Sequence, residues 1–90
     1  MKNIPKIQLV LSNLTMLLRN GGENDWAHLL NQLNRNIEID PDAAFSKLFS
    51  IFGGMGSFGD IVLYRDGQPL IAENNELSEL RSNLYDLCHE

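Results

Sequence analysis

The 90-residue sequence has few cysteines, few cations and no long hydrophobic run, and each shortage argues against a kind of structure or partner. The single cysteine, Cys88, cannot form an internal disulfide and fits a reducing compartment. Seven lysines and arginines stand against twelve aspartates and glutamates. This balance argues against nucleic-acid or anionic-membrane binding, because both need clustered cations. No apolar stretch approaches the ~20 residues of a membrane span. We therefore expect a cytoplasmic protein with neither nucleic-acid nor membrane partners.

The net charge of −5 is unevenly spread along the chain. Residues 1–20 sum to +3, whereas residues 21–90 sum to −8. Neither a linker nor a repeat interrupts the sequence, and its length suits one hydrophobic core. We expect a single domain over residues 1–90.

Three helices are expected in the first half. The apolar spacing predicts the first from Ile4 to Asn20, with Gly21 following at positive φ. The second is expected from Asn24 or Asp25 to Asn36, with Asn24 as its N-cap. The third has Asp40 as N-cap and Pro41 in its first turn, and it ends at Gly53. Its apolar stripe is predicted to consist of Ala44, Phe45, Leu48, Phe49 and Phe52.

The second half predicts a β-hairpin and a last helix. Asp60–Tyr64 has strand character, Asp66 and Gly67 suit a type I′ turn, and 68–72 is expected as an edge strand containing Pro69. The last helix is expected from Asn75 to Cys88, capped by Asn74 or Asn75. The fold class is therefore mainly α (α+β), with four helices and one small antiparallel hairpin between the third and fourth.

No motif in the sequence builds a convincing active site. Gly54, Gly56 and Gly59 have the spacing of a dinucleotide fingerprint, but they follow a helix and precede a strand, the reverse of the order that motif needs. His28 is expected at the helix surface and Cys88 in the core, because a metal or nucleophile site needs converging partners. We expect no catalytic residue, no cofactor and no metal, and hence no enzyme.

Charged and aromatic side chains offer a candidate contact surface instead. Acids gather around the second and third helices, and further polar residues lie near the hairpin. A solvated surface explains them simply, whereas a negative face that steers a basic partner is the functional alternative. The candidate partner-binding residues are Glu23, Asp25, Glu38, Asp40, Asp42, Asp60, Tyr64, Arg65 and Asp66.

The segment from Leu48 to Leu63, LFSIFGGMGSFGDIVL, resembles the signature of an uncharacterised family of small bacterial proteins with an LFGGMGS-F/L-N/D-D-L-V-L motif. In that family a tryptophan-bearing helix precedes the motif and a leucine-rich helix follows it, as Trp26 and the stripe from Leu77 to Leu87 do here. Gly59 departs from the polar residue usual at its position. Some members resemble immunity proteins of contact-dependent toxin systems. The resemblance implies a cytoplasmic inhibitor of one cognate toxin and carries over no catalytic residue.

Different functions follow from these features. The first is an immunity or antitoxin-like protein that binds a toxin with a basic cleft, with a monomer favoured. The alternatives are a small ligand-binding or enzymatic domain that uses Gly53–Asp60, and a structural homodimer built on the apolar face of the first helix.

Overall fold

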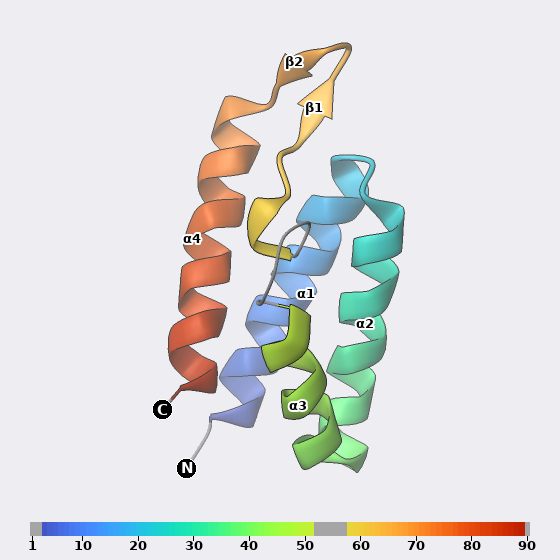
Figure 1. The fold of residues 1–90 in the computed structure, drawn as a ribbon, viewed down its shortest axis with the longest axis vertical. Coiled ribbons are helices and arrows are strands. Elements are labelled where there is room, and N and C mark those ends of the chain that lie inside the picture. Colours follow the sequence, from blue (N-terminus) through green and yellow to red (C-terminus); the bar gives the residue numbers. More distant parts are fainter. Residues whose placement is uncertain (1–2, 52–57, 90) are drawn as a thin grey trace.

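A computed structural model describes residues 3–51 and 58–89 (Figure 1). In these residues four helices and a small antiparallel sheet follow in the predicted order, so the fold class is confirmed. The elements are α1 (Ile4–Asn20), α2 (Asn24–Ile39), α3 (Pro41–Ile51), the 3₁₀ turn η1 (Phe58–Asp60), β1 (Tyr64–Arg65), β2 (Gln68–Pro69) and α4 (Ile71–Cys88).

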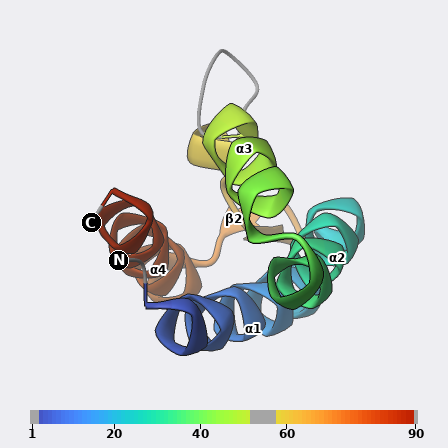
Figure 2. The same ribbon diagram turned by 90° about the horizontal axis from the view of Figure 1, so that it is seen from below.

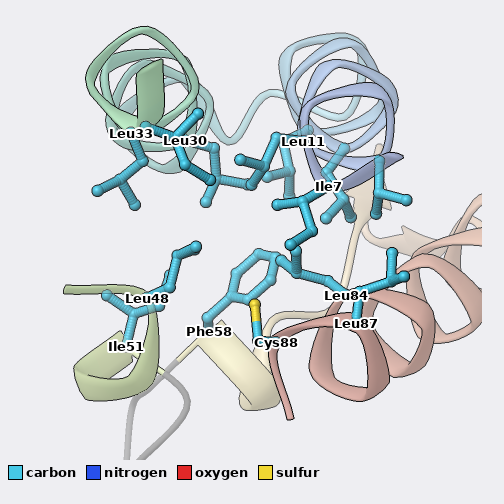
Figure 3. Close-up of a cluster of buried hydrophobic side chains, with 14 of the residues drawn as sticks. Ile7, Leu11, Leu30, Leu33, Leu48, Ile51, Phe58, Leu84, Leu87 and Cys88 are labelled. Carbon is cyan, nitrogen blue, oxygen red and sulfur yellow. The ribbon is translucent and has the colours of Figure 1, made fainter. Parts of the chain in front are cut away.

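Helix α1 lies between α2 and α4, and α3 packs across the open side of this row (Figure 2). The turn η1 fills the space between α3 and α4, where it delivers Phe58 to the centre of the molecule (Figure 3). The Phe58 side chain is fully buried, and its ring centroid lies 5.4 Å from that of Trp26. The aromatic pair therefore joins α2 to η1, and Trp26 packs on the core.

The apolar face of α1 is covered within the chain. Five of its side chains, Ile7, Val10, Leu11, Leu14 and Leu18, are at most 8% exposed because α2 and α4 pack against them. This face supplies the centre of the core, so it is not the open surface that the homodimer alternative requires.

Helix α1 spans the predicted residues, and α3 starts where predicted. Oδ1 of Asp40 accepts a hydrogen bond from the Ala43 amide at 3.2 Å, as expected of an N-cap. Helix α2 begins at Asn24, within the predicted start, but its N-cap and its end differ from the prediction. Its N-cap is Glu23, which makes no side-chain capping bond, and the helix continues to Ile39. Asn24 is thus the first helical residue, and its predicted capping role is wrong.

The turn between α1 and α2 uses its glycines differently from the prediction. Gly21 has φ −85°, so its predicted positive φ is wrong, and Gly22 takes that conformation with φ +85°. Gly21 is required by close approach, because a Cβ there would lie 2.7 Å from Cδ2 of Leu63. The absent side chain lets the segment before the hairpin pack on the end of α1.

The hairpin is shorter than predicted, although its type I′ turn is confirmed by φ values of +53° at Asp66 and +78° at Gly67. The expected strand Asp60–Tyr64 is wrong, since only Tyr64 and Arg65 pair, with Pro69 and Gln68 respectively. The return strand ends at Pro69 because α4 already begins at Ile71.

Asn74 explains why the strand region and α4 differ from the prediction. Its side chain is not an N-cap. Instead Oδ1 accepts from the Leu63 amide at 2.7 Å, and Nδ2 donates to the Leu63 carbonyl at 3.0 Å. The Leu63 carbonyl also accepts from the Leu70 amide at 2.9 Å, so Asn74 replaces a strand partner only for the Leu63 N–H. Its side chain ties the segment before β1 to α4.

The predicted stripe of α3 also needs one correction. Phe49 is 40% exposed and stands edge-on to the His89 ring, with centroids 5.1 Å apart, whereas Ile51 is buried in its place. Phe52 and the glycines at 53, 54 and 56 lie outside the described residues.

Candidate partner-binding surface

The nine predicted contact residues fall in three separate places. Glu23, Asp25, Tyr64, Arg65 and Asp66 lie at the hairpin end of the molecule, near the turn between α1 and α2 (Figure 1). The acids at positions 38, 40 and 42 lie at the opposite end, where α2 meets α3. The 16 residues of α2 separate the two groups by about 24 Å. The position 60 carboxylate belongs to η1, away from both.

At the hairpin end, part of the polar surface serves the fold. Nη2 of Arg65 donates to the carbonyl oxygen of Asn20 at 3.4 Å, at the end of α1. The guanidinium thus meets the negative end of the α1 dipole, where a cation is favoured. Tyr64 is 56% exposed and remains available at the surface.

Asp60 lies beside a half-buried arginine, Arg81, which is not among the predicted contact residues. Nη1 of Arg81 donates to the carbonyl oxygens of Phe58 at 2.9 Å and Ile61 at 3.2 Å. Burial lowers the pKa of the Arg81 guanidinium, and the charge of Asp60 raises that pKa in partial compensation. Arg81 lies one helical turn after the buried Leu77, so a cation on the apolar stripe of α4 was the available signal.

A small groove lies at the opposite end of the molecule, between α2 and α3. Its volume is about 240 Å³, and its lining residues are Leu33, Asn36, Ile39, Asp40, Ala43 and Ala44. The buried Leu33 and Ala44 form its apolar floor. The groove exists because α3 presents two alanines here, where larger side chains would fill the space.

Ile39 lines this groove and is 81% exposed. Ile39 is not among the nine predicted contact residues. Successive helical residues are about 100° apart, so Ile39 lies about 200° from Ile37 and out of phase with the buried stripe. An aliphatic residue out of phase with the core stripe was the signal that could have identified it.

The charge around the groove is negative. Residues 36–44 contain three acids and no base. Asp40 lines the groove, and Asp42 lies in the first turn of α3, directly before Ala43. Glu38 faces α1 instead, where its Oε1 accepts from Nε2 of Gln8 at 3.1 Å. We define Ile39, Asp40, Asp42 and Ala43 as the acidic corner.

The remaining predictions about chemistry concern metals, membranes and the glycine segment. Among residues 3–51 and 58–89, the His, Cys, Asp and Glu side chains nowhere gather in threes that could hold a metal ion. Within those same ranges no helix combines the length and apolarity needed to cross a bilayer. His28 is exposed and Cys88 buried, as expected. The ligand-binding alternative falls on Gly53–Asp60, of which 53–57 lie outside the described residues.

Residues 19–71 match the profile of a family described as a domain of unknown function, DUF6966. The chain belongs to this family. The matched DUF6966 segment contains α2, α3, η1 and the hairpin, so it includes all nine predicted contact residues and the acidic corner. No curated protein and no solved structure matches the chain. The LFSIFGGMGSFGDIVL segment predicted an uncharacterised family, and the description of this family names no function.

Proposed function

We propose that this chain is a small cytoplasmic binding protein that neutralises one cognate bacterial toxin by direct contact and not by catalysis. The observation that carries the proposal is the acidic corner, where Asp40 and Asp42 accompany an isoleucine that is 81% exposed. The resemblance of the Leu48–Leu63 segment to a family with immunity-like members supports the same function.

The combination of acids with an exposed aliphatic side chain suits a protein partner. Toxins that cut nucleic acids need basic clefts, and an acidic surface is attracted to such a cleft and competes with the substrate. Charges of this kind mainly speed association and select the partner. A central apolar side chain that becomes buried supplies most of the binding free energy. Ile39 is suited to that second role.

The proposal is tested by co-expression with the product of the neighbouring upstream gene. We expect the neighbour to arrest growth when expressed alone, and this chain to restore growth and co-purify with it as a complex. A neighbour that is neither toxic nor bound would refute the proposed function.

Two double variants of equal net charge make the test specific to the surface. Asp40→Asn with Asp42→Asn removes two charges from the acidic corner and keeps the cap of α3, because asparagine caps as well as aspartate. Asp25→Asn with Asp66→Asn removes two charges from the hairpin end, and asparagine tolerates the positive φ of position 66. We expect only the corner variant to lose protection.

A further inference from the structure

The groove of the acidic corner is too small for a typical metabolite and large enough for one side chain. Its volume of about 240 Å³ lies below the roughly 300–1,000 Å³ of small-molecule sites. Its floor is apolar and formed by Leu33 and Ala44, and the exposed Ile39 stands at its edge. An apolar depression beside an apolar projection matches the anchor sites that proteins use to bind one another.

We propose that this groove is the docking site for a basic segment of a partner protein, which inserts one aliphatic side chain between α2 and α3 and contacts Ile39. This inference rests on the proposed function, since it names the surface and the chemistry of the partner. The aliphatic side chain would rest on Leu33 and Ala44, and Lys or Arg residues beside it would meet Asp40 and Asp42.

Charge distinguishes this groove from the hollow between α1 and α4. Between α1 and α4 a hollow of about 280 Å³ is lined by both Lys6 and Asp86, so it favours neither sign of charge. Around the acidic corner the nearest bases in sequence are Arg35, one turn before Ile39 on α2, and Lys47, one turn after Ala43 on α3. The residues between these two bases include three acids and no base. A cationic segment is therefore favoured at the corner.

The experiment uses the full chain and a 14-residue amphipathic helical peptide of leucine and lysine as the probe. Titration is followed by amide chemical shifts. We expect shifts confined to the groove, at residues 33, 36, 39, 40, 43 and 44. A matched peptide with serine in place of leucine keeps the charge, and one with glutamate in place of lysine keeps the apolar face. Both should bind at least about tenfold more weakly, because the serine peptide loses a buried aliphatic group and the glutamate peptide replaces two attractive contacts with repulsive ones.

Ala43 offers a variant that closes the groove without disturbing the fold. Ala43 is exposed, and leucine has nearly the helix propensity of alanine, so Ala43→Leu should fold normally. It should weaken peptide binding about tenfold, because the new side chain occupies the space that the probe needs. Ala43→Ser keeps the groove open and should bind like the unaltered chain.

Several results would overturn the docking site. The first is equal affinity of the leucine–lysine peptide for the Ala43→Ser and Ala43→Leu variants. The second is chemical-shift changes centred on the α1–α4 hollow or on the hairpin. The third is a serine peptide that binds as well as the leucine peptide. The toxin test is separate. Binding of the peptide in the groove together with a harmless neighbour would leave the docking site standing and refute the toxin partner. Protection by the Ala43→Leu variant equal to that of the unaltered chain would refute the docking site alone.

Discussion

Asn74→Ala removes both hydrogen bonds by which α4 holds the segment before β1. These bonds join its side-chain amide to the Leu63 amide at 2.7 Å and to the Leu63 carbonyl at 3.0 Å, in partly buried surroundings. In the variant the Leu63 carbonyl keeps the hydrogen bond from the Leu70 amide at 2.9 Å, so only the Leu63 N–H loses its partner. Each neutral hydrogen bond contributes about 1 kcal/mol, and an unpaired partly buried donor costs about 1 kcal/mol more. We expect a loss of about 2–3 kcal/mol, from a total on the order of 5–13 kcal/mol.

Asn75→Ala is the matched control, because Asn75 is the next residue of α4 and is exposed. Both substitutions gain the same helix propensity, about 0.6 kcal/mol, so the difference between the variants isolates the bonds to Leu63. Urea unfolding followed by circular dichroism measures it. With a slope of about 1 kcal/mol per molar urea, the midpoint of Asn74→Ala should lie about 2 M below that of Asn75→Ala. Midpoints within about 0.5 M of each other would show that the two hydrogen bonds between the Asn74 side chain and the Leu63 backbone contribute little to stability.

The turn between α1 and α2 and the half-buried Arg81 give further predictions. Gly21→Ala should lower stability by about 1–3 kcal/mol in thermal unfolding, because its Cβ would meet Leu63 at 2.7 Å. Gly22→Ala meets nothing within 4 Å but must adopt φ +85°, which costs about 1–2 kcal/mol. Asparagine should recover part of that loss at position 22 and none at position 21, and equal recovery at both would contradict the distinction. Arg81→Lys should cost about 1–2 kcal/mol in urea unfolding, because a compact, strongly hydrated ammonium costs more to half-bury than the guanidinium whose Nη1 serves the Phe58 and Ile61 carbonyls. Arg35→Lys, at an exposed position on α2, should leave stability unchanged, and equal losses for the two lysine variants would refute the role of Arg81.

The elements that the sequence predicted well are those whose signals are local. Spacing alone placed α1 from Ile4 to Asn20, and the cap at Asp40 placed the start of α3. The Asp66-Gly67 turn followed from the need for positive φ at both positions. In each case the determining residues lie within a few positions of the feature, so no knowledge of the tertiary structure was needed.

The predictions that were wrong depended on contacts between residues distant in sequence. Asn74 reads as a helix cap, but its side chain binds the backbone of Leu63, 11 residues earlier, and gives the Leu63 N–H a partner outside the hairpin. Gly21 reads as a positive-φ residue, but its small size serves the same leucine across the fold. No local pattern reports either contact.

Only the acidic residues of the candidate surface could be predicted from the sequence. Asp40 and Asp42 were singled out from charge alone, but their neighbours in the groove were not. Ala44 was taken only as part of the core stripe of α3, and Ile39 was passed over although it lies out of phase with the buried stripe of α2. Which small residue faces a groove depends on how α2 and α3 cross, and the sequence pattern does not specify that crossing.

The central claim is that the acidic corner, and not the hairpin end, binds a basic partner. The most direct test is the affinity of the leucine–lysine peptide for the two double variants, measured by titration calorimetry at low and at physiological salt. Asp40→Asn with Asp42→Asn should weaken binding about fivefold at low salt and less at higher salt, because exposed attractive charges contribute about 0.5 kcal/mol each and are screened. Asp25→Asn with Asp66→Asn, which has the same net charge, should bind like the unaltered chain. Equal weakening by both variants would show that only net charge attracts the peptide, and the acidic corner would then have no special role.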